Sequence, residues 1–116
     1  MEGTFEKRVY PRHRLRTEVV FEDEWGQGFI YFYSTDLSLG GIFFESELPL
    51  KQGTKVFLSF KLPNNPAPIR ATGEVVRQER EAQDPSRVIG TGIRFGDLSA
   101  KTAALIETFL EESPHA

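Results

Sequence analysis

The sequence of 116 residues contains no cysteine and only two histidines, His13 and His115. Without cysteine the chain has no disulfide framework, no thiolate nucleophile and no Cys-ligated zinc. Because the two histidines stand near opposite ends of the chain, a metal site built mainly on imidazole is not expected. Sites made of carboxylates alone stay open. We therefore predict no metal and no cofactor.

Long hydrophobic runs are also missing. No apolar stretch approaches the roughly 18 residues that a membrane-spanning helix needs, so membrane insertion is not expected. Residues 1–16 are charged and lack the apolar stretch of a signal peptide, which predicts a cytoplasmic protein. The length allows one hydrophobic core and is too short for two, so we expect a single domain.

Positive charge is concentrated near the N-terminus. Residues 7–16 contain five lysines and arginines and no acid, while the rest of the chain holds 9 basic and 17 acidic residues. This distribution predicts an anion-binding element at the N-terminus, and a solvated basic tail is the alternative. The acidic remainder argues against a nucleic-acid-binding surface that extends over the whole domain, because contact with phosphates requires basic residues.

Six segments have the composition or the alternation of β-strands. The clearest is residues 55–62, in which Val56, Leu58 and Phe60 alternate with mostly polar residues and are expected in the core. Residues 63–68, rich in proline and asparagine, are expected to break the chain. The six predicted strands are Thr17–Phe21, Gly28–Ser34, Gly41–Glu45, Lys55–Leu62, Ile69–Gln78 and Arg87–Phe95.

One helix is expected at the C-terminal end of the chain. Ser99 can cap a helix in which Ile106, Phe109 and Leu110 recur at helical spacing. Closely spaced strands followed by one terminal helix favour a barrel over alternating strands and helices. The predicted fold class is mainly β, a six-stranded antiparallel β-barrel with a C-terminal α-helix.

Two groups of residues have the chemistry of a binding site. In the first, Arg8 and Arg12 flank Pro11 in an extended segment, and each guanidinium can hold a phosphate or a guanine edge bidentately. The second runs from Asp36 to Gly41 between two strands, with the sequence Asp-Leu-Ser-Leu-Gly-Gly. It is predicted either as a turn stabilised by side chains with glycine at positive φ, or as a ligand contact through Asp36, Ser38 and Gly41.

The combination of Arg-x-x-x-Arg with Asp-x-Ser-x-x-Gly resembles the signature of the PilZ domain family. Both motifs match without a substitution, and residues 90–95, Gly-Thr-Gly-Ile-Arg-Phe, resemble the glycine-rich last strand of such domains. The resemblance covers residues 7–110 and implies a PilZ-like barrel of residues 16–112 with its C-terminal helix. It also implies that residues 1–15 form the basic N-terminal arm that carries Arg-x-x-x-Arg.

Members of this family bind cyclic di-GMP, a bacterial second messenger. The resemblance therefore implies a bacterial receptor that relays a signal to a downstream protein partner. It implies ligand contacts by Arg8, Arg12, Asp36, Ser38 and Gly41. A basic residue before the first motif arginine accompanies two stacked ligands in the family, so Lys7 favours two ligands per chain.

Three other functions are alternatives to that of a receptor. An enzyme is not expected, because no serine has a histidine near it in sequence and no phosphate loop is present. A nucleic-acid-binding barrel would need an exposed stack of Phe29, Tyr31, Tyr33, Phe43 and Phe44, and such a stripe is more often core. A PilZ-like adaptor would act through protein contacts near Trp25 and the C-terminal helix.

Overall fold

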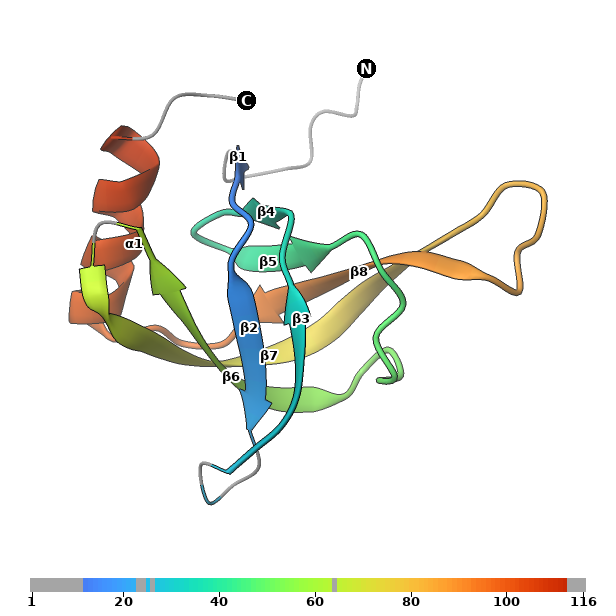
Figure 1. The fold of residues 1–116 in the computed structure, drawn as a ribbon, viewed down its shortest axis with the longest axis horizontal. Helices are drawn as coiled ribbons and strands as arrows, with labels where there is room; N and C mark the ends of the chain where they lie inside the picture. The colour runs from blue at the N-terminus through green and yellow to red at the C-terminus, as the bar shows by residue number, and fades with distance from the viewer. Residues whose placement is uncertain (1–11, 23–24, 26, 64, 113–116) are drawn as a thin grey trace.

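The computed structural model describes residues 12–22, 25, 27–63 and 65–112, which form one antiparallel sheet and one helix (Figure 1). The strand order is β1-β4-β5-β8-β7-β6-β2-β3. The elements are β1 (His13–Arg14), β2 (Glu18–Glu22), β3 (Gly28–Tyr33), β4 (Asp36–Leu37), β5 (Gly41–Phe44), β6 (Lys55–Leu62), β7 (Asn65–Arg80), β8 (Val88–Phe95) and α1 (Ala100–Glu112).

The two ends of this strand order are joined through the chain itself. β1 runs on into β2, and β3 runs on into β4, so residues 13–22 lie antiparallel to residues 28–37 along their length. The gap in this pairing is bridged by the Leu15 N–H donating to the Thr35 carbonyl and the Ser34 N–H donating to the Thr17 carbonyl, each at 3.0 Å. The sheet therefore curls into a barrel.

The predicted mainly β fold with a C-terminal helix is confirmed, but the strand count of six is too low. The described residues contain eight strands, because β1 lies in residues assigned to the arm and β4 lies in residues predicted as a turn. When β1 is joined to β2 and β3 to β4, the six predicted positions around the barrel are recovered.

The division of the chain into an arm of residues 1–15 and a barrel of residues 16–112 stays a prediction. Residues 1–11 lie outside the described residues. His13 and Arg14, which this division assigned to the arm, pair with β4, and Leu15 lies in the hydrophobic core. The last residues before β2 thus contribute to the sheet and its interior.

The core follows the alternation expected for half-buried strands. On β6 the side chains of Val56, Leu58, Phe60 and Leu62 are buried, while the intervening residues are exposed or half-buried. α1 lies beside β7 at one end of the barrel, with Ile106 and Phe109 buried (Figure 1). The Ser99 hydroxyl accepts a hydrogen bond from the Thr102 N–H at 3.1 Å, so the predicted helix cap is confirmed.

Residues 63–68 were expected to interrupt the strands, but β7 already begins within this stretch. β7 begins at Asn65, which pairs with Leu62, and Ile69 pairs with Phe60. Residues 66–68 therefore bulge opposite Lys61, where a missing proline N–H removes no ladder hydrogen bond. β7 and β8 also extend beyond the barrel as a projecting hairpin (Figure 1).

The buried hydroxyl of Ser34 is expected to stabilise the closure of the barrel. It donates to the Leu15 carbonyl at 2.6 Å and accepts from the Thr17 N–H at 3.2 Å. Ser34→Ala leaves both backbone groups without this partner, so the free energy of unfolding should fall by about 1 to 3 kcal/mol in urea denaturation. Ser59→Ala, on the outer face of β6, is the control, and equal stability of the two variants would contradict this role.

Candidate ligand-binding site

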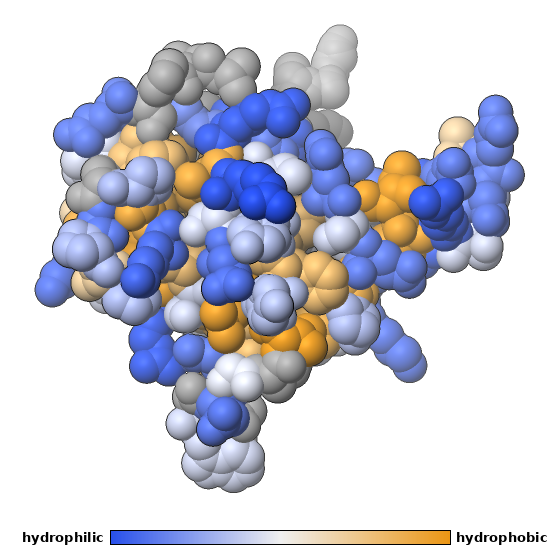
Figure 2. All heavy atoms as spheres, viewed as in Figure 1, coloured by the Kyte–Doolittle hydropathy of each residue, from blue (hydrophilic) through white to orange (hydrophobic). Residues whose placement is uncertain are grey.

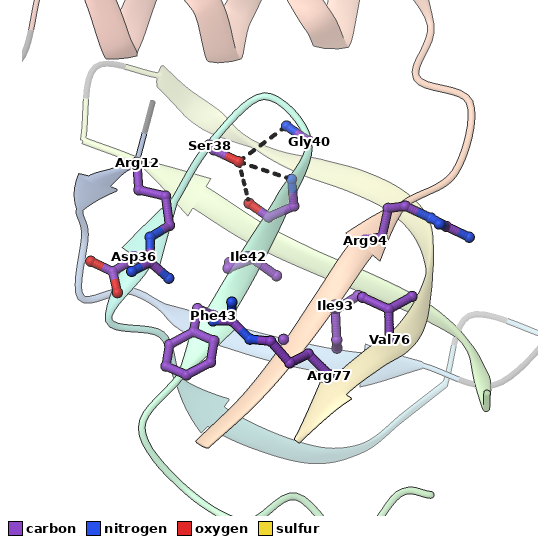
Figure 3. Close-up of a pocket in the computed structure, with 12 residues that line it drawn as sticks. Arg12, Asp36, Ser38, Gly40, Ile42, Phe43, Val76, Arg77, Ile93 and Arg94 are labelled. Atoms are coloured by element: carbon purple, nitrogen blue, oxygen red, sulfur yellow. Dashed lines mark hydrogen bonds between the residues drawn. The ribbon is translucent and has the colours of Figure 1, made fainter. Parts of the chain in front are cut away.

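A pocket of about 390 Å³ lies on the barrel where the hairpin of β4 and β5 meets β7 and β8 (Figure 3). Its wall combines residues from the segment before β1 with residues from four strands and one turn. The lining residues are Arg12, Asp36, Ser38, Gly40, Gly41, Ile42, Phe43, Val76, Arg77, Gly92, Ile93 and Arg94.

The pocket brings together the described residues of both sequence motifs. Arg12 precedes β1, and β1 pairs with β4, which begins at Asp36. Ser38 lies in the turn to β5, Gly41 begins β5, and both line the pocket. Arg8 and Lys7 lie outside the described residues, and the ligand contacts expected of all these residues stay predictions.

The side chain of Ser38 organises the turn between β4 and β5. Its hydroxyl oxygen accepts hydrogen bonds from the N–H groups of Gly40 at 3.1 Å and Gly41 at 3.2 Å (Figure 3). The Ser38 N–H donates to the Gly41 carbonyl at 2.9 Å. The expectation of a turn stabilised by a side chain is therefore confirmed. The Ser38 hydroxyl oxygen lies 3.5 Å from the Gly41 carbonyl oxygen, so the hydroxyl donates only a weak hydrogen bond there.

The expectation that glycine supplies positive φ in this turn is wrong. Gly53 is the only glycine with a positive φ among the described residues. Gly41 is instead required by the close approach of β5 to β8, where it pairs with Arg94. A Cβ on Gly41 would collide with the carbonyl oxygen of Ile93. Packing between strands, rather than turn geometry, restricts this position to glycine.

Two guanidinium groups flank one aromatic ring in the pocket. The Cζ of Arg12 lies 5.6 Å from the centroid of the Phe43 ring, and the Cζ of Arg77 lies 4.8 Å from it. Both distances suit cation–π contact. Gly90 on β8 leaves room for this arrangement, since a Cβ there would lie 2.6 Å from Phe43.

Arginines on β7 and β8 add positive charge to the pocket. Arg77 pairs with Glu79 at 3.2 Å, and Arg94 pairs with Glu74 at 3.3 Å (Figure 3 shows Arg94 directed away from Phe43). With Arg12 they place three guanidinium groups against the single lining carboxylate of Asp36. Two of these three guanidinium groups already pair with acidic side chains, Glu79 and Glu74, which lie outside the lining.

Arg77 was not among the residues predicted for the site, although it lines the pocket. Its position depends on a register shift between Val75 and Arg77 that places Arg77 opposite Gly92. The glycines of residues 90–95 were the only available signal, since a strand rich in glycine indicates close approach by other groups.

The aromatic side chains that were predicted to lie in the core differ in burial between β3 and β5. Phe43 and Phe44 are buried, as expected for core, whereas Tyr31 and Tyr33 are exposed on the outer face of β3, so the core prediction is wrong for these two. In the described residues no group of three or more His, Asp or Glu side chains could hold a metal ion. No helix among them has the length and hydropathy to span a membrane.

Together, the fold and the pocket define a small β-barrel domain whose pocket is lined by three arginines. The model of the PilZ domain family matches residues 6–112, so this chain belongs to that family. No match was found among the curated proteins.

Solved structures of PilZ proteins have the same fold at low sequence identity. The inhibitor of motility MotI/DgrA from Bacillus subtilis is 19% identical with a TM-score of 0.68, over 93% of this chain and 53% of that one. The PilZ domain of YcgR from Escherichia coli, solved with c-di-GMP, is 17% identical with a TM-score of 0.61, over 92% and 94%. The MrkH–c-di-GMP complex from K. pneumonia is 19% identical with a TM-score of 0.66, over 92% and 52%.

The chain spans about half the length of two of the longer solved chains that it matches. It covers 53% of MotI/DgrA and 45% of a longer YcgR structure from Escherichia coli in complex with c-di-GMP. The similarity to these proteins is therefore a similarity to one part of each.

The close packing of β5 on β8 predicts unequal effects of adding one methyl group at two pocket glycines. Gly41→Ala should lower the free energy of unfolding by about 1 to 3 kcal/mol, because the strands must separate to accommodate the Cβ. Gly92→Ala is the matched control, since its Cβ would find its nearest atoms at 3.5 Å. Chemical denaturation of both variants tests this, and equal losses would contradict it.

Proposed function

We propose that this chain is a receptor for cyclic di-GMP that relays the presence of the ligand to a downstream protein partner. The observation that carries the proposal is the meeting of Arg12 with Asp36, Ser38 and Gly41 in one pocket. Family membership supports it, as do the PilZ structures solved with c-di-GMP. The proposed setting is the cytoplasm of a bacterium, which the family resemblance implies.

The chemistry of the pocket suits the two kinds of group in this ligand. Each phosphate is an anion that a guanidinium can hold through two parallel hydrogen bonds, and Arg12 stands at the pocket wall for this purpose. The guanine edge carries N–H donors that the carboxylate of Asp36 can accept. Arg8, in the same motif, is proposed as the second phosphate-binding arginine.

The proposed roles of Ser38 and Gly41 differ from those of Arg12 and Asp36. The Ser38 oxygen is already occupied by two backbone N–H groups, so the hydroxyl acts on the ligand only by donating its proton to a phosphate oxygen. Gly41 keeps β5 against β8 and so sets the position of the turn. Both residues thus hold the shape of the anion site.

Arg77 is proposed as an additional ligand contact. Its guanidinium carbon lies 4.8 Å from the centroid of the Phe43 ring, and both residues line the pocket (Figure 3). A planar guanidinium stacks on aromatic rings, which a lysine ammonium does not reproduce. We propose that Arg77 stacks on a guanine base of the bound ligand. Catalysis is not proposed, because the lining residues include no histidine and no nucleophile paired with a base.

The first measurement is isothermal titration of the protein with cyclic di-GMP, with GMP and cyclic AMP as control ligands. Arg12→Ala is expected to weaken binding by about tenfold to 150-fold, because hydrogen bonds to charged groups each contribute about 1.5 to 3 kcal/mol. Asp36→Ala should have a comparable effect. Arg80→Ala, at the far end of β7, is the charge-matched control and should bind like wild type.

Several outcomes of this titration would decide between the alternatives. If Arg12→Ala binds cyclic di-GMP with wild-type affinity, the proposed role of Arg12 in holding a phosphate is wrong. Absence of any binding would favour the adaptor that acts without ligand, and steeply salt-dependent binding of single-stranded nucleic acid would favour the nucleic-acid module. Saturation at two ligands per chain is the result expected from Lys7, and saturation at one would contradict that expectation.

A pair of variants separates stacking by Arg77 from its charge. Arg77→Ala should weaken cyclic di-GMP binding by about twofold to 30-fold, which corresponds to a cation–π contact of 0.5 to 2 kcal/mol. Arg77→Lys keeps the charge and should recover little affinity if the planar group stacks on the base. Arg87→Ala, on the projecting hairpin, is the control, and full recovery by Arg77→Lys would show that only charge matters.

A further inference from the structure

Arg77 is paired with an acidic side chain of its own strand. Oε2 of Glu79 lies 3.2 Å from Nη2 of Arg77. The two residues are two positions apart on β7 and pair in register with Gly92 and Gly90 of β8, so their side chains leave the same face of the sheet. The protein therefore supplies Arg77 with an anion of its own.

The carboxylate of Glu79 lies close to the aromatic ring of the pocket, although Glu79 does not line the pocket itself. A Cβ built on Gly90 would stand 2.6 Å from Cζ of Phe43 and 3.3 Å from Oε1 of Glu79. The tip of the ring and the carboxylate are thus neighbours above the backbone of Gly90. An anionic group that approaches Arg77 from the pocket meets the negative charge of Glu79 at short range.

Both partners of this ion pair are accessible to solvent. The side chain of Arg77 is 45% exposed and that of Glu79 is 50% exposed. Ion pairs this exposed contribute little to folding stability, because water and dissolved ions screen the attraction. The carboxylate can therefore leave Arg77 when another anion arrives, and Glu79 can be replaced without unfolding the barrel.

The planar guanidinium of Arg77 offers its faces and its edge to different partners. Its Cζ lies 4.8 Å from the centroid of the Phe43 ring, and stacking on a guanine base would also use a face. The N–H groups along the edge donate to oxyanions, so a carboxylate and a phosphate compete for them. Glu79 lies at one of these edge nitrogens.

The other acid that pairs with a pocket arginine is held differently. Oε1 of Glu74 lies 3.3 Å from Arg94 and 3.7 Å from Lys55, and the Glu74 side chain is only 30% exposed. Because two cations hold this carboxylate, it is less readily displaced. Arg94 is also directed away from Phe43 (Figure 3). Glu79 is therefore the acid whose position opposes a ligand at the Phe43 ring.

We propose that Glu79 is an internal competitor for Arg77. Its carboxylate occupies the guanidinium edge that an anionic group of the ligand would bind, and it thereby lowers the affinity of the pocket. This inference rests on the proposed function for the identity of the ligand. It adds the residue that sets the concentration of cyclic di-GMP at which the receptor responds.

Isothermal titration of Glu79→Gln with cyclic di-GMP is the direct test. The amide keeps the size of the side chain and an acceptor oxygen but removes the charge. The affinity should rise about twofold to fivefold over wild type, which is the range of an exposed ion pair. Glu81→Gln is the matched control, because Glu81 pairs with Arg87 at 3.6 Å on the projecting hairpin, and its affinity should equal that of wild type.

A double variant tests whether Glu79 acts through Arg77. In the Arg77→Ala background, Glu79→Gln should leave the affinity for cyclic di-GMP unchanged, because the competition has lost its object. A gain as large as in the wild-type background would show that the charge of Glu79 repels the ligand directly. That result would overturn the competition for Arg77.

An inorganic anion separates this inference from the identity of the ligand. Pyrophosphate is titrated into wild type and Glu79→Gln, and the Nε–Hε signal of Arg77 is followed by NMR, with that of Arg87 as the control. Half-saturation should need about twofold to fivefold less pyrophosphate in Glu79→Gln. If this gain is seen while no variant binds cyclic di-GMP, the proposed ligand is wrong and the role of Glu79 stands.

Three results would overturn the role of Glu79. The first is equal affinity of wild type and Glu79→Gln for both anions. The second is weaker binding by Glu79→Gln, which would show that the carboxylate positions Arg77 for the ligand. The third is an Arg77 signal that does not move at any pyrophosphate concentration, because competition requires that an external anion reach this guanidinium.

Discussion

The close pairing of β5 with β8 is the constraint on which the rest of the site depends. Gly41 lies directly against the backbone of β8, and the Gly40 carbonyl accepts a hydrogen bond from the Phe95 N–H at 2.9 Å. This contact holds the turn containing Ser38 against β7 and β8. Because β4 precedes the turn and pairs with β1, the same contact brings Asp36 and Arg12 to the arginines of the last two strands.

The proposed anion site depends on arginines that lie within an acidic domain. The acidic side chains Glu74 and Glu79 pair with Arg94 and Arg77 but do not line the pocket. A ligand phosphate that enters can exchange with these carboxylates for the guanidinium groups. Such surface ion pairs contribute little to stability, so this exchange has a small energetic cost.

Much of this architecture could be predicted from local patterns. The alternation of residues 55–62, the cap at Ser99 and the two family motifs were visible because each depends on neighbours within a few positions. Three features were not visible in this way. These features are the two short strands β1 and β4, the register shift at Arg77 and the exposure of Tyr31. Each depends on which strands lie beside one another.

The sequence by itself determined the mainly β class, the terminal helix and the membership of Arg12, Asp36, Ser38 and Gly41 in one family signature, because residue type and short spacing carry this information. Only the tertiary structure decided that Arg77 faces the same pocket and that Gly41 is needed for strand packing. It also decided that, among the described strands, β3 pairs with β2 alone. The physical reason is that these properties arise from contacts between strands far apart in sequence, and alternation within one strand does not identify its neighbour.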